Sequence, residues 1–316
     1  MSASKLLTYI SQNDILDRIS FQDVNSIPKI ILSIATIRSG TTASLRVYSE
    51  VGIHSFAQPM KSIFRFLAKG KSNKDCDWLI PKEDVIYVKE TFGPFNLEEA
   101  TLNPIETLFY LFHNLLKNKV NTEHLTTETL ALMKKKVHLI VMGRNPFDSW
   151  FSNKETYVKF MKGVEENEKW YYEVTLEELL YYHLIAFRQV QKVATFAEYL
   201  GIPISYYVAE ANKEPVKAIN NLFTRIGIKT KPSLNNWTSK SIVGGQNSKV
   251  KITIDHAPQK RAGLFEKVNL SNGLKYNRGK GVLLPQNEIQ IIQSSGVTVL
   301  HKKWKANTEM DLDINL

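Results

Sequence analysis

A short apolar segment followed by a glycine-containing turn and a helix is the feature that most restricts the fold of this chain. Residues 29–35 (Lys-Ile-Ile-Leu-Ser-Ile-Ala) are rich in β-branched side chains, which is typical of a strand buried on both faces. A turn signal at 38–40 follows, and residues 41–51 then form a helix pattern that stops before Gly52. A strand, a tight turn and a helix in this order open a parallel α/β sheet.

Alternating strand and helix patterns continue along the chain. Further strands are predicted at 85–88, 137–142 and 204–208, and helices at 103–117, 175–200 and 214–226. This alternation favours an α/β fold, with one mostly parallel central sheet flanked by helices. We expect a single domain over residues 1–316, with a polar, helical lead-in at 1–27 and a loop-rich region over the cofactor and substrate at 229–316.

Composition limits the class of protein. A hydrophobic fraction of 43% with 23% charged residues predicts a sizeable core in a chain of 316 residues. Cys76 is the single cysteine, which rules out an internal disulfide and fits a cytoplasmic location. We expect no membrane span and no secretory signal, because no apolar run is long enough. Cysteine and histidine do not cluster at the spacing of metal ligands, so we also expect no metal.

The net charge of +10 favours a polyanionic partner, which could be nucleic acid, an anionic membrane or a phosphorylated small molecule. The two densest basic runs, at 134–136 and 301–303, contain no interleaved aromatic residues for stacking on bases. A phosphorylated small molecule is therefore the favoured partner, and a basic nucleic-acid-binding protein is kept as an alternative.

The turn after the first predicted strand has the residue types of a phosphate-binding loop. Ligands of an open parallel sheet bind beyond the carboxyl ends of its strands, where the following helix presents free N–H groups. Gly40 allows close backbone approach, Arg38 supplies a cation, and hydroxyl donors come from Ser39, Thr41 and Thr42. The G-x-x-x-x-G-K-[ST] pattern of ATPases is absent. A P-loop-like phosphate loop is predicted, and a phosphotransferase with an atypical loop is a second alternative.

Two motifs resemble one enzyme family. Residues 38–42 (Arg-Ser-Gly-Thr-Thr) are similar to the 5′-phosphosulfate-binding loop of sulfotransferases that use 3′-phosphoadenosine 5′-phosphosulfate (PAPS). Residues 143–152 (Gly-Arg-Asn-Pro-Phe-Asp-Ser-Trp-Phe-Ser) resemble the family's R-N-P-x-D stretch, in which a serine lies eight positions after the arginine. The resemblance implies that Arg144 and Ser152 hold the 3′-phosphate of the cofactor.

A third segment concerns catalysis. Lys89 and Glu90 follow the predicted strand 85–88, at a place where many sulfotransferases carry a lysine near the transferring group and a base close by. The resemblance implies catalytic roles for Arg38, Lys89 and Glu90, with Glu90 as general base and His54 and His113 as rival bases. Adjacent strand residues point to opposite faces, so Lys89 and Glu90 share a site only if the strand ends before them.

Weaker similarities cover the C-terminal third. Tyr207 resembles a tyrosine that contacts adenine, and Gly245 and Lys249 lie in a segment similar to a loop that covers the cofactor. Residues 260–263 and 278–281 both resemble another cofactor loop of the family. The family implies metal-free transfer of a sulfuryl group from PAPS to a hydroxyl or amine of a small molecule, leaving adenosine 3′,5′-bisphosphate. The sequence does not indicate the acceptor or the oligomeric state.

Overall fold

The structure is a computed structural model that describes residues 9–71, 76–234, 252–254, 274 and 281–316. A six-stranded sheet lies at its centre, with the strand order β7-β6-β2-β5-β3-β8 and every pair parallel. This confirms the predicted α/β fold. The strands are β2 (Lys29–Thr36), β3 (His54–Ala57), β5 (Val85–Phe92), β6 (Val137–Gly143), β7 (Ile204–Val208) and β8 (Ile252–Ile254).

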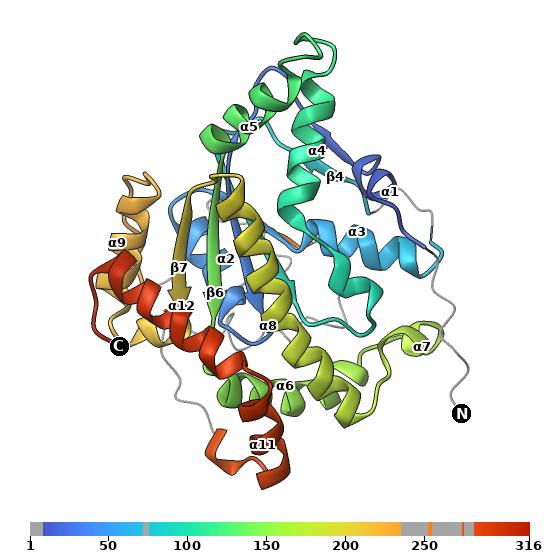
Figure 1. Cartoon of the computed structure of the whole chain (residues 1–316), viewed down its shortest axis with the longest axis vertical. Coiled ribbons are helices and arrows are strands. Elements are labelled where there is room, and N and C mark those ends of the chain that lie inside the picture. The colour runs from blue at the N-terminus through green and yellow to red at the C-terminus, as the bar shows by residue number, and fades with distance from the viewer. Residues whose placement is uncertain (1–8, 72–75, 235–251, 255–273, 275–280) are drawn as a thin grey trace.

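Helices cover both faces of the sheet (Figure 1). Helices α3 (Pro59–Ala68), α4 (Pro104–Leu116) and α8 (Leu176–Tyr199) contribute buried side chains to one hydrophobic cluster, together with Val88 of β5. Helices α2 (Thr41–Glu50) and α9 (Pro215–Arg225) pack on the other face, together with Tyr87 of β5. Neighbouring residues of one strand thus enter different cores, which is why these strands read as continuous apolar runs.

The helix starts follow the expected local chemistry. The Thr175 hydroxyl accepts a bond from the Glu178 amide, and the Glu178 carboxylate accepts one from the Thr175 amide, so α8 begins with a capping box. Pro104 and Pro215 occupy first-turn positions of α4 and α9. Each of these starts agrees with the sequence pattern to within two residues.

The predicted helical lead-in is mostly wrong. Within residues 9–27 the only α-helix is α1 (Gln12–Leu16), and β1 (Ile19–Phe21) follows it. This strand pairs in parallel with β4 (Trp78–Ile80), in a second sheet of two strands. Pairing with a segment that lies far away along the chain overrides the local pattern.

The expected loop-rich C-terminal region also needs correction, since most of residues 281–316 are helical. Helix α11 (Gln286–Ser294) is followed by α12 (Val297–Leu312). The buried residues of α12 recur at helical spacing, at Val297, His301, Trp304, Thr308 and Leu312. Because two of these five are polar, the apolar pattern along this helix is weak in the sequence.

Helix α12 runs beside β7, an edge strand of the sheet (Figure 1). The Asp311 carboxylate accepts a 2.8 Å hydrogen bond from the Tyr206 amide, and the Thr308 hydroxyl accepts one of 3.2 Å from the Val208 amide. Side chains therefore take up backbone donors that a seventh strand would otherwise use.

The chain passes from β5 across β2 to β6, so its direction of winding reverses beside β2. In open parallel sheets, ligands bind beyond the carboxyl ends of the strands at such a point. Residues 37–42 and 144–152 follow β2 and β6, which are neighbours in the sheet. None of the helices that the structure describes has the length and apolar character needed to cross a membrane.

Candidate functional site

The loop after β2 is held in an unusual backbone conformation. Arg38 has a φ of 67° and Gly40 a φ of 82°, and only glycine adopts such values at little cost. A 2.6 Å hydrogen bond between the hydroxyls of Thr36 and Ser39 closes the turn, and Thr41 Oγ1 lies 3.3 Å from Thr91 Oγ1. Gly40 precedes the first residue of α2, whose N-terminus has no side-chain cap. The loop therefore presents the amide end of a ten-residue helix, as a phosphate-binding loop requires.

The two sequence motifs meet in space. Arg38 Nε donates a 3.0 Å hydrogen bond to Ser152 Oγ across 114 residues of sequence. The Arg144 guanidinium donates a hydrogen bond to the Arg38 carbonyl at 3.4 Å. Ser152 reaches this position because α6 (Pro146–Met161) begins directly after β6, with Asn145 as its N-cap. Two arginines and a hydroxyl thus converge at the carboxyl ends of β2 and β6.

Three cationic side chains, those of Arg38, Arg144 and Lys89, lie near one another around the loop. Burial lowers the pKa of Arg38, and the neighbouring charge of Arg144 lowers it further. Burial also lowers the pKa of Lys89 to about 8; the Glu90 carboxylate opposes this change, while Lys61 and Arg38 add to it. Arg38 makes no ion pair with a carboxylate in the part of the chain that is described. Cations that lower one another's pKa are stabilised by a bound anion.

Lys89 and Glu90 lie on opposite faces of the sheet, because β5 continues to Phe92 and does not end before them. Lys89 shares its face with Tyr87 and Thr91, which contact α2. Glu90 faces α3, where its carboxylate accepts hydrogen bonds from the amides of Met60 (2.8 Å) and Lys61 (3.4 Å). The condition for the two residues to share one site is therefore not met, and the general-base role of Glu90 stays a prediction.

A buried charge network surrounds Glu90. Burial raises the pKa of Glu90 to about 7, against the lowering effects of the Met60 amide and of Lys61. Lys61 Nζ donates to the Thr91 carbonyl at 2.6 Å and lies 3.1 Å from Glu99, which also binds Arg65. The network fastens the end of β5 to α3 and to the segment that follows the strand. Sequence reasoning missed it, because no local pattern indicates that three charged residues so far apart will be buried together.

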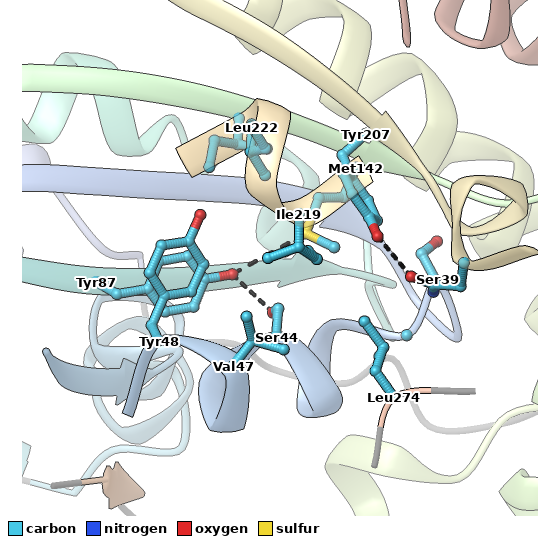
Figure 2. A pocket seen from close by; sticks show the side chains of 13 residues that line it. Ser39, Ser44, Val47, Tyr48, Tyr87, Met142, Tyr207, Ile219, Leu222 and Leu274 are labelled. Carbon is cyan, nitrogen blue, oxygen red and sulfur yellow. Dashed lines mark hydrogen bonds between the residues drawn. The ribbon is translucent and has the colours of Figure 1, made fainter. Parts of the chain in front are cut away.

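A largely apolar pocket adjoins the phosphate loop, between the sheet and helices α2 and α9. Figure 2 shows the stacked rings of Tyr48 and Tyr87 at one end, and Ser39 and Tyr207 at the other. The cavity volume of the pocket is about 20 Å³, which is room for about one water molecule. Its lining residues are Ser39, Gly40, Ser44, Val47, Tyr48, Tyr87, Ile140, Met142, Tyr207, Asn212, Ile219, Leu222 and Leu274.

The pocket unites two predicted cofactor regions, since Ser39 and Gly40 come from the loop and Tyr207 from β7. The Tyr207 hydroxyl donates a 2.5 Å hydrogen bond to Asn212 Oδ1 on the 3-10 helix Ala209–Lys213. The same short helix carries Glu210, whose carboxylate accepts a 2.9 Å hydrogen bond from the Asn145 amide. It therefore connects the pocket with the R-N-P motif.

The C-terminal helices hold α6 in place. Glu288 of α11 accepts hydrogen bonds from Trp150 Nε1 at 2.6 Å and from Lys154 Nζ at 2.7 Å. These residues lie on either side of Ser152 in the sequence of α6. The Gly281 amide donates to Asp148 at 3.0 Å in the first turn of the same helix.

The other predicted residues fall elsewhere. His54 is the first residue of β3, at the end of the sheet opposite the loop, and it bonds to Thr253 of β8. His113 is in the last turn of α4 and lies 3.5 Å from Thr129 of α5 (Leu125–Lys136). Gly245 and Lys249 lie outside the described residues.

Among the residues with described positions, no three histidine, cysteine or acidic side chains gather as metal ligands do. A scan against protein-family models found no match, and searches of curated proteins and of solved structures found none either.

Proposed function

We propose that this protein is a sulfotransferase that moves a sulfuryl group from PAPS to a hydroxyl or amine of a small molecule, without a metal and in the cytoplasm. The observation that carries the proposal is the 3.0 Å contact between Arg38 and Ser152. It joins the two motifs that resemble the family's 5′- and 3′-phosphate sites, and these motifs follow neighbouring parallel strands.

The residues of the loop fit the two anionic ends of an adenosine nucleotide. Arg38 and Arg144 supply permanent cations, and the N-terminus of α2 supplies backbone donors. The adjoining pocket, with Tyr207 at one end, has a mainly apolar and aromatic lining, but its cavity of about 20 Å³ is too small for a purine base. Ser39 and Gly40, which follow Arg38 in the loop, also line this pocket.

The reaction needs charge stabilisation more than covalent help from the protein. The acceptor oxygen or nitrogen attacks sulfur and loses its proton, and the bond from sulfur to the bridging oxygen breaks, leaving adenosine 3′,5′-bisphosphate. Negative charge grows on that oxygen and on the sulfuryl oxygens, where Arg38 and Lys89 would stabilise it. Lys89 is buried on the face of the sheet that contacts α2 and the loop. Glu90 lies on the opposite face, where its hydrogen bond with the Met60 amide holds β5 against α3.

Calorimetry with adenosine 3′,5′-bisphosphate tests the binding step directly. We expect saturable binding and a higher melting temperature, because a ligand that prefers the folded state stabilises it. Ser152→Ala should weaken binding about tenfold or more, whereas Ser294→Ala on α11 is a matched control without effect. No binding at millimolar ligand would refute the proposal. Tighter binding of magnesium nucleoside triphosphates would favour a phosphotransferase. Binding of oligonucleotides with an affinity that falls steeply as the salt concentration rises would favour a nucleic-acid-binding protein.

Activity is then measured with PAPS and a panel of phenols, alcohols, amines and guanidinium compounds. Formation of adenosine 3′,5′-bisphosphate that depends on one acceptor class would identify that class. Lys89→Met should lower turnover much more than affinity for adenosine 3′,5′-bisphosphate, because the charge of Lys89 is needed most in the transition state.

A further inference from the structure

Helix α6 carries Ser152, so the rotation of this helix about its own axis decides whether Ser152 can reach the phosphate loop. The 3.0 Å hydrogen bond from Arg38 Nε to Ser152 Oγ shows that the serine faces the loop. An α-helix turns by about 100° per residue, so side chains two positions away from Ser152 are rotated from it by about 160°. Trp150 and Lys154 occupy these two positions and therefore lie on the opposite side of α6.

A single carboxylate binds both of these side chains. Glu288 Oε2 accepts a 2.6 Å hydrogen bond from Trp150 Nε1, and Glu288 Oε1 accepts one of 2.7 Å from Lys154 Nζ. Trp150 is fully buried and the Glu288 side chain is 14% exposed, so water competes little for these bonds. Trp150 and Lys154 are four residues apart, which makes them neighbours on one face of the helix. Two bonds from one carboxylate to successive turns oppose a rotation of α6 in either direction.

Glu288 is itself firmly placed. It lies in the first turn of α11, where the helix dipole stabilises a negative charge. Helix α12 follows, and its Val297 and Trp304 are fully buried in the same hydrophobic cluster as Trp150. We propose that Glu288 is a positioning residue, which acts through α6 to keep Ser152 at the phosphate loop. This inference rests on the proposed function, which puts a phosphate of the nucleotide at Ser152.

Calorimetry with adenosine 3′,5′-bisphosphate tests the role of Glu288. Glu288→Ala should weaken binding about threefold to tenfold, the effect expected when one hydrogen bond to the ligand is lost. Glu288→Gln should weaken it less, because the glutamine oxygen can still accept from Trp150 Nε1 while its amide nitrogen cannot accept from Lys154. Glu309→Ala is a matched control without effect: Glu309 is a half-buried glutamate of α12 that accepts a hydrogen bond from the Leu316 amide.

A double-mutant cycle with Ser152→Ala separates positioning from a general loss of stability. If Glu288 acts through Ser152, Glu288→Ala should cause no further loss once the serine hydroxyl is gone, and the double variant should bind as Ser152→Ala does. A purely structural role would lower affinity by the same factor in both backgrounds. Melting temperatures measured without ligand show whether each variant is folded, and Glu288→Gln replaces Glu288→Ala in the cycle if the alanine variant is not.

The outcomes separate this inference from the proposed function. If the wild type does not bind adenosine 3′,5′-bisphosphate, the proposed function is refuted and the inference with it. If the wild type binds and the change at Glu288 has no effect, or has the same effect with and without the Ser152 hydroxyl, the proposed function stands and the positioning role of Glu288 is refuted.

Discussion

Replacing Glu90 by glutamine should remove a pH dependence of stability that this one carboxyl creates. Its pKa lies at about 7 in the folded protein, against an ordinary value of 4.5, because the group is fully buried. Between these values the unfolded chain has released the proton and the folded chain still holds it. A carboxyl group whose pKa is raised by folding stabilises the folded state at pH values below the ordinary pKa of the group. This stabilisation is lost as the pH rises through the pKa of the folded protein. One pKa unit corresponds to about 1.4 kcal/mol, so the loss amounts to about 3 kcal/mol.

Glutamine keeps a carbonyl oxygen for the Met60 amide and cannot ionise. The free energy of unfolding, measured with urea from about pH 5 to about pH 8, should fall in the wild type relative to Glu90→Gln by about 2–3 kcal/mol. The same comparison with Glu98→Gln, which changes an exposed carboxylate eight residues away, should show no such trend. A difference between wild type and Glu90→Gln that stays constant over this range would refute the reasoning from burial.

The turnover of Glu90→Gln distinguishes a general base from a residue that only supports the fold. A general base contributes about 10²- to 10⁴-fold, so its loss would reduce the rate by that factor and remove the acidic limb of the pH–rate profile. A residue that only holds β5 against α3 would leave most of the turnover intact. The hydrogen bonds from the Met60 and Lys61 amides favour the second result.

Three further expectations concern the loop and its supports. Arg38→Ala should lower turnover more than affinity for adenosine 3′,5′-bisphosphate, and Arg38→Lys should recover part of the lost turnover. Equal losses of turnover and affinity, or a large fall in melting temperature, would argue for a purely structural role of Arg38. Gly143→Ala should destabilise the fold by about 1–3 kcal/mol, because a Cβ there would lie 2.6 Å from the Trp304 ring, and unchanged urea unfolding would contradict this. Binding of adenosine 3′,5′-bisphosphate near pH 8 should take up protons, since an anion raises the lowered pKa of Lys89; a heat of binding independent of the buffer would contradict this.

The sequence predicted the parts of the fold that have a local signal. Strands β2, β6 and β7 are continuous apolar runs, and the helices after them begin at prolines, capping residues or the loop glycine. The four-residue strand β3 was missed, because its His-Ser-Phe-Ala sequence has no run to detect and its pairing with β5 is decided by distant residues.

The site was predictable where a motif is contiguous in sequence. The loop around Arg38 and the stretch that contains Ser152 could be recognised separately. Their contact depends on β2 and β6 being neighbours in the sheet, which the sequence does not indicate. The face on which Glu90 lies could not be predicted, because it depends on β5 extending through two charged residues. The burial of Glu90 is accompanied by amide donors from α3, a tertiary contact without a local signature.

The contact between α12 and β7 also affects how copies of this chain can meet. An uncovered edge strand is a template on which a strand from another molecule can align and extend the sheet. Asp311 and Thr308 occupy the amides of Tyr206 and Val208, so an incoming strand would find these two donors already used and the body of a helix in its way. A chain from which α12 had detached would lose this barrier, and its tendency to pair edge to edge would rise with protein concentration. Helix α12, whose Trp304 ring lies against Gly143 at the end of β6, thus also blocks the pairing of another strand with β7.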